Sequence, residues 1–159
     1  MQVKIVEVGL RDGLQNEQKI VPTELKKTVL EKLLQVGLRH IEVTSFVHPK
    51  WIPSLADAEG LLADVPKSRG VTFSALVPNS RGMDRAAKFD LDEIAVFMSA
   101  SETHNQKNIN KSISDTYSVL KPVVESAKDK GIRVRGYVST VFGCPYEGNV
   151  SVASVMSVC

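Results

Sequence analysis

The chain has 159 residues, enough for one domain of ordinary size. Hydrophobic residues make up 43% of it and charged residues 24%, which is typical of a soluble globular protein. The net charge of +2 is too small to indicate nucleic acid or a membrane surface as a partner. No apolar run approaches the roughly 18 residues needed to cross a bilayer.

Strand-like and helix-like segments alternate along the chain. Short apolar runs predict five strands, at residues 3–8, 40–46, 71–77, 93–98 and 132–141. Helices are predicted from residue 23 to Gly37, at 55–64, at 80–88, from a capping box at Ser112 to Gly131, and from about residue 151. The alternation favours an α/β fold with a parallel sheet and right-handed crossovers, and leaves open whether the sheet is closed.

The first helix has the clearest pattern. Thr23 is expected to cap it, and Leu25, Val29 and Leu33 recur on one face. Leu30 and Leu34 widen this stripe, which is expected to face the core.

The loop after the first predicted strand contains Arg11 and Asp12 between Gly9 and Gly13. Catalytic groups of parallel α/β proteins gather where strands end and loops begin. A carboxylate at that point can bind a divalent metal or move a proton, and a guanidinium can stabilise an oxyanion. A surface salt bridge is the simpler interpretation of this short motif.

Glu42 falls inside an otherwise apolar predicted strand. A carboxylate in a buried strand is costly unless it is paired. Glu42 therefore either points into a barrel mouth with Arg11 and Asp12, or points outward to a lysine on a helix.

Several segments in order resemble 3-hydroxy-3-methylglutaryl-CoA lyases, which are metal-dependent barrel enzymes. Residues 6–17, VEVGLRDGLQNE, closely resemble the first-strand motif of that family. Its later segments are matched by IEVTSFV at 41–47, PKWIP at 49–53, KNIN at 107–110, RGYVS at 135–139 and GCPYEG at 143–148. The resemblance covers the whole chain.

The resemblance implies a (β/α)8 TIM barrel, truncated here to about five β/α units, with residues 1–159 forming a single incomplete catalytic domain. A complete barrel needs at least about 200 residues. Asp12 matches a metal-binding carboxylate and a candidate for proton transfer with the substrate's C3 hydroxyl. Arg11 matches the arginine that holds the thioester carbonyl, with Gln15 as a further substrate-binding residue and Glu42 in a supporting role. The metal implied is Mg²⁺ or Mn²⁺.

The reaction implied is retro-Claisen cleavage of 3-hydroxy-3-methylglutaryl-CoA to acetoacetate and acetyl-CoA, a step of leucine catabolism and ketone body formation. The family completes its metal site with a His-x-His pair, which His40, His48 and His104 do not form. The 159 residues alone are therefore expected to be inactive. The resemblance also implies the mitochondrial matrix, but no presequence precedes the first strand, and the cytoplasm is the alternative.

The remaining candidate residues have two interpretations each. His48 and His104 are expected in loops on the active face, either exposed or contacting substrate. Lys50, Lys107 and Lys111 can meet CoA phosphates or form a solvated rim.

The two cysteines, Cys144 and Cys159, indicate neither a disulfide framework nor a zinc site, so a reducing compartment is expected. Cys144 is expected to shape its loop, and Cys159 is expected to have no catalytic role.

Two other functions remain open. Related barrels condense acetyl-CoA with 2-oxo acids, as isopropylmalate and homocitrate synthases do. Alternatively, the chain acts only as a non-catalytic assembly partner. Unpaired strand edges of an interrupted barrel predict self-association or a homo-oligomer.

Overall fold

The computed structural model describes residues 3–65 and 70–159 and contains a four-stranded parallel sheet in the order β1-β2-β3-β4. The strands are β1 (His40–Ser45), β2 (Thr72–Leu76), β3 (Glu93–Ser99) and β4 (Arg133–Ser139). Each strand pairs in parallel with the next one along the chain. This order is that of a barrel wall, and four of the five predicted strands are confirmed.

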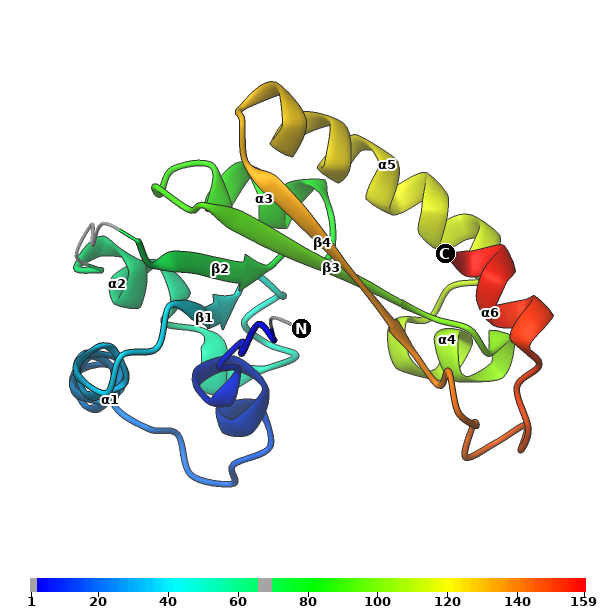
Figure 1. Ribbon diagram of the computed structural model, residues 1–159, viewed down its shortest axis with the longest axis horizontal. Coiled ribbons are helices and arrows are strands. Elements are labelled where there is room, and N and C mark those ends of the chain that lie inside the picture. The colour runs from blue at the N-terminus through cyan, green and yellow to red at the C-terminus, as the bar shows by residue number, and fades with distance from the viewer. Residues whose placement is uncertain (1–2, 66–69) are drawn as a thin grey trace.

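Helices precede, connect and follow the strands along the chain (Figure 1). They are α1 (Thr23–Gln35), α2 (Ala58–Ala63), α3 (Ser80–Ala86), α4 (Glu102–Ile109), α5 (Ile113–Asp129) and α6 (Val152–Val158). A π-helix, η1 (Gly9–Gly13), and a 3-10 turn, η2 (Pro53–Leu55), complete the elements. α1 packs on α2, α3 packs on α5, and α5 packs on β3 and β4.

The two faces of the sheet differ in polarity because side chains alternate along each strand. One set is buried in the hydrophobic core with the helices and includes Ile41, Val43, Phe73, Ala75, Ile94 and Val96. The alternate positions carry polar groups, among them Glu42, Ser74, Glu93, Arg135 and Tyr137. The face turned away from the helices is therefore the polar interior of the barrel wall.

The prediction of a strand at residues 3–8 is wrong. This segment makes a single parallel bridge, between Glu7 and Ile41. Val3 is 79% exposed and Ile5 is 66% exposed. Among the described residues, β1 is the segment's only neighbouring strand, so its apolar side chains lack a second packing partner.

α1 begins where it was predicted, but Thr23 does not cap it. Its hydroxyl instead donates to Asp57 Oδ2 (2.7 Å). The apolar stripe is only partly confirmed: Leu30, at 3% exposure, is in the core, whereas Leu25 is 51% exposed and Val29 38% exposed. The helix turns Lys26 inward instead, because Asp57 and a backbone carbonyl satisfy its charge.

Helix α4 was not predicted. Ser101 caps it by accepting from the His104 N–H (3.1 Å), and it ends at Asn110 in the left-handed region (φ 55°). The predicted cap at Ser112 and the stops at Gly37 (φ 92°) and Gly131 (φ 71°) are confirmed. Within residues 3–65 and 70–159, no helix has the length and apolarity to cross a membrane.

Candidate active site

A cavity of about 760 Å³ opens at the carboxyl end of the strands. Active sites of barrel proteins lie at this end. η1 contributes Arg11 and Asp12, the segment after it contributes Gln15, and β4 contributes Tyr137 and Ser139. The rest of the wall comes from the loops after β1 and β2, from β3, and from α4 and α5.

The local fold of η1 directs Arg11 and Asp12 to the cavity. Leu10, which is 2% exposed, anchors the short π-helix in the core. The Gly9 N–H donates to Glu7 Oε1 (2.6 Å), and a Cβ on Gly9 would lie only 2.7 Å from that oxygen. A side chain at residue 9 would therefore require the Glu7 carboxylate to move away. Irregular π-helical turns of this kind are frequent at functional sites.

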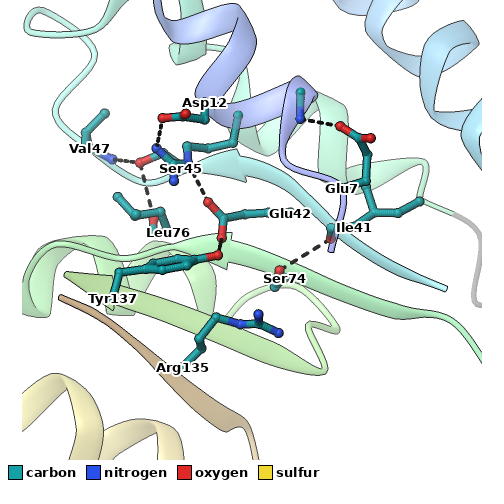
Figure 2. Close-up of polar contacts among 12 residues, drawn as sticks. Glu7, Asp12, Ile41, Glu42, Ser45, Val47, Ser74, Leu76, Arg135 and Tyr137 are labelled. Atoms are coloured by element: carbon teal, nitrogen blue, oxygen red, sulfur yellow. Dashed lines mark hydrogen bonds and ion pairs between the residues drawn. The ribbon is translucent and has the colours of Figure 1, made fainter. Parts of the chain in front are cut away.

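Arg11 is held by the carboxylates of Asp12 and Glu42, and both of these residues are labelled in Figure 2. Its Nε donates to Glu42 Oε1, and its Nη1 donates to Asp12 Oδ1 (2.8 Å). The side chains of Arg11, Asp12 and Glu42 are 14%, 57% and 0% exposed. The three predicted residues therefore lie together, with Arg11 in contact with both of the others. A surface salt bridge describes only the exposed Asp12, because Arg11 is partly buried and Glu42 is buried.

Glu42 lies on the interior face of β1. Each carboxylate oxygen has a partner: Oε1 accepts from Arg11, and Oε2 accepts from the Tyr137 hydroxyl (2.9 Å). These contacts offset the cost of burying a charged group. The alternative of an outward Glu42 paired with a helix lysine is wrong.

Tyr137 is the site residue that the sequence analysis missed. Burial and the nearby charge of Glu42 raise the pKa of Tyr137 to about 12. The phenol therefore stays protonated at neutral pH and acts as a donor. One sequence signal was available, since alternation in β4 places Arg135, Tyr137 and Ser139 on one face.

A second ion pair lies nearer the amino ends of the strands. Glu93 accepts from Arg135 Nη2 (2.7 Å) and Nε (2.8 Å). The Arg135 guanidinium also lies 6.0 Å from the centre of the Tyr137 ring. This pair was not predicted, and it neutralises a buried charge below the cavity.

The structure separates the other candidate residues by position. Five of them line the cavity: Gln15, His48, His104, Lys107 and Lys111. Lys50 is not among the described residues that line it. His48 lies in a loop as predicted, and its Nδ1 accepts from the Lys50 N–H (3.3 Å). His104 lies in α4 rather than in a loop and is half-buried, because Ser101 begins a helix there.

Cys144 is 6% exposed and is absent from the described cavity wall. Its Sγ accepts from the Ser101 hydroxyl (2.9 Å) and from the Tyr146 N–H (3.4 Å). These contacts tie the loop after β4 to the start of α4, in agreement with the loop-shaping role predicted for Cys144. Cys159 is exposed at the end of α6.

Asp12 is suited to be one ligand of a hard divalent cation. It is the one acidic residue among the described residues of the cavity wall. Oδ1 is engaged by Arg11, and the carboxylate is 57% exposed. No cluster of three or more His, Cys, Asp or Glu side chains that could hold a metal occurs in residues 3–65 and 70–159. Among these described residues, Asp12 is therefore a candidate ligand that does not form a complete metal site by itself.

Taken together, the parallel sheet, its helices and the cavity at the carboxyl end of the strands are the architecture of part of an α/β barrel wall. The family model described as HMGL-like matches residues 2–159, and the chain belongs to this TIM-barrel family.

Several hydroxymethylglutaryl-CoA lyases are similar to this chain along nearly its whole length. Hydroxymethylglutaryl-CoA lyase YngG of Bacillus subtilis is 52% identical over 155 residues, which are 98% of this chain and 52% of that protein. The mitochondrial hydroxymethylglutaryl-CoA lyase of Bos taurus is 48% identical, covering 99% of this chain and 48% of the relative. The cytoplasmic 3-hydroxy-3-methylglutaryl-CoA lyase of Danio rerio is 50% identical, and the match covers 98% of this chain and 47% of that protein. The chain thus spans about half the length of these relatives, which include mitochondrial and cytoplasmic proteins.

Solved structures agree with this assignment. The crystal structure of the Bacillus subtilis HMG-CoA lyase superposes with a TM-score of 0.95 at 51% identity, covering 99% of this chain and 53% of that one. The structure of an HMG-CoA lyase of Acinetobacter baumannii, in complex with coenzyme A and 3-methylmalate, superposes with a TM-score of 0.91 at 35% identity. The match covers 99% of this chain and 53% of that one.

Proposed function

We propose that this chain is part of an enzyme that cleaves 3-hydroxy-3-methylglutaryl-CoA to acetoacetate and acetyl-CoA, with residues 1–159 forming part of one barrel domain. The observation that carries the proposal is the buried Glu42 carboxylate, which holds the Arg11 guanidinium beside the exposed Asp12 at the cavity wall. An activity shared by relatives that are about half identical to this chain supports it.

Arg11 has the geometry of an oxyanion stabiliser. Cleavage of the C2–C3 bond leaves an enolate on the thioester oxygen, and this charge must be held until carbon is protonated. The Arg11 guanidinium is fixed by two carboxylates and only 14% exposed, so it can donate to that oxygen with little reorganisation. Gln15 lines the same cavity and is the second substrate-binding residue in this scheme.

Asp12 is the group that accepts the proton of the C3 hydroxyl, because its carboxylate is the exposed acid–base group beside Arg11. It also acts as one oxygen ligand of Mg²⁺ or Mn²⁺. A divalent metal, when bound, polarises oxygen atoms of the substrate and lowers the energy of developing negative charge. Glu42 supports both groups by fixing the direction of the Arg11 side chain.

The ligand of the cavity is an acyl-CoA in this proposal. Lys107 and Lys111 lie on its wall and supply positive charge for an anionic substrate. The Acinetobacter baumannii relative, which was crystallised with coenzyme A, supports the same ligand class.

The test uses an extended protein, in which this chain is joined to the part of the Bacillus subtilis relative that it does not span. It is incubated with Mg²⁺ and 3-hydroxy-3-methylglutaryl-CoA, and separately with acetyl-CoA and 2-oxo acids. Release of acetoacetate in the first reaction, with no condensation in the second, is expected. Condensation without cleavage would overturn the proposal and favour a relative of isopropylmalate synthase.

A further inference from the structure

The Tyr137 hydroxyl is linked to Arg11 through one carboxylate. Its oxygen donates to Glu42 Oε2 (2.9 Å), while Glu42 Oε1 accepts from Arg11 Nε. Tyr137 and Glu42 are separated by 95 positions and lie on β4 and β1 (Figure 2). The link therefore crosses the interior face of the sheet and ends at η1.

The two carboxylates that bind Arg11 leave one of its three side-chain nitrogens without a hydrogen-bond partner among the described residues. Nε is directed at Glu42 and Nη1 at Asp12, so the guanidinium plane is fixed by two different partners. Within the described residues, no acceptor contacts Nη2. Because Arg11 lines the cavity, Nη2 can offer its N–H groups to a substrate oxygen.

We propose that Tyr137 is a positioning residue, which acts through Glu42 to aim the Arg11 guanidinium at the substrate's thioester oxygen. Without the phenol donor, the Glu42 carboxylate can rotate about its side chain, and Arg11 then loses its fixed direction. The inference rests on the proposed lyase function and names a residue that sets the geometry of the same site.

A role for Tyr137 in direct proton transfer is disfavoured by its chemistry. Burial and the charge of Glu42 raise the pKa of Tyr137 to about 12, so the group is not a base at neutral pH. Its hydroxyl proton is also committed to Glu42. Tyr137 therefore acts on the reaction through another side chain.

The experiment compares four forms of the extended protein: unmodified, Tyr137→Phe, Glu42→Gln and the double variant. Phenylalanine keeps the ring and removes only the donor. We expect Tyr137→Phe to lower kcat by about tenfold, with KM changed by less than about twofold, since the enolate charge develops in the transition state and is absent from the bound substrate. Tyr117→Phe is the matched control, because the Tyr117 hydroxyl donates to the Val158 carbonyl (2.6 Å) away from the cavity, and its kcat is expected to stay unchanged.

The double variant decides between positioning and a general structural role. If Tyr137 acts through Glu42, adding Tyr137→Phe to Glu42→Gln causes little further loss of kcat. Multiplied losses, or an unchanged kcat in Tyr137→Phe, would overturn the inference. If the unmodified extended protein releases no acetoacetate, the proposed function fails. Non-additive losses of stability in urea unfolding of the same four proteins then still test the link between Tyr137 and Glu42.

Discussion

The ammonium nitrogen of Lys26 lies 2.6 Å from Oδ1 of Asp57 and is buried in the core, with 1% of the side chain exposed. The same nitrogen donates to the Ser54 carbonyl (2.6 Å). Asp57 is 25% exposed and also accepts from the Thr23 hydroxyl. The two partners therefore differ in burial, and they join α1 to the segment that carries the cavity-wall residues Trp51 and Ile52.

This difference predicts unequal effects of removing each partner. Asp57→Ala leaves an uncompensated buried cation and is expected to cost about 3–5 kcal/mol of unfolding free energy. Lys26→Met leaves Asp57 in contact with solvent and Thr23, and is expected to cost only about 1–3 kcal/mol, for the unpaired Ser54 carbonyl. Urea unfolding of the extended protein measures both. Equal losses of unfolding free energy in the two variants would show that the deeper burial of Lys26 does not determine the cost of breaking the ion pair.

The raised pKa of Tyr137 predicts a loss of stability at alkaline pH. In the unfolded chain the phenol ionises near its ordinary pKa of 10.0, whereas the folded value is about 12. The folded state binds the proton more tightly, so this contribution is fully present below pH 10 and is lost as the pH rises toward 12. Urea unfolding at a series of pH values checks it. The decline between these values is expected to be shallower in Tyr137→Phe, and an identical decline would contradict the assignment.

The sequence predicted those elements whose signals are local. Short apolar runs located the four strands of the sheet to within two residues at each end, and Ser112 and Gly131 marked the ends of α5. Arg11 and Asp12 were predicted in the loop after a strand, and alternation along the second predicted strand allowed Glu42 to point into a barrel mouth with them. The resemblance strengthened that prediction with motifs along the whole chain.

What the sequence did not predict depends on contacts between distant residues. Glu42 and Tyr137 are 95 positions apart and lie on the two edge strands, β1 and β4, so only the curvature of the folded sheet lets them meet across its interior face. Lys26 was not expected to be buried, because its partners Ser54 and Asp57 lie 28 and 31 positions away, in η2 and at the N-cap of α2. The strand at residues 3–8 failed for the related reason that an apolar run forms a strand only where neighbouring strands pair with it.

The free edge of the sheet predicts self-association of a polypeptide limited to these 159 residues. Among the described strands, β4 pairs only with β3, and an unpaired edge invites pairing with another chain. In the segment that follows β4 in the chain, Phe142 is 102% exposed and Met156 is 68% exposed. Sedimentation velocity at micromolar concentration is expected to detect dimers or larger species, reduced in a Phe142→Ser, Met156→Ser variant. A single monomeric species from the unmodified polypeptide would contradict this prediction.

The most direct test of the proposed active site is acetoacetate release from 3-hydroxy-3-methylglutaryl-CoA by the extended protein and by its Arg11→Gln variant. Arg11 is the residue that joins Glu42 and Asp12, and removing one oxyanion-stabilising donor typically lowers kcat by about 10²–10³-fold. Arg81→Gln is the matched control, since Arg81 is exposed on α3 and is absent from the described cavity wall. We predict a loss of that size in Arg11→Gln and none in Arg81→Gln. Acetoacetate release by Arg11→Gln at the unmodified rate would contradict the assignment of this cluster as the active site.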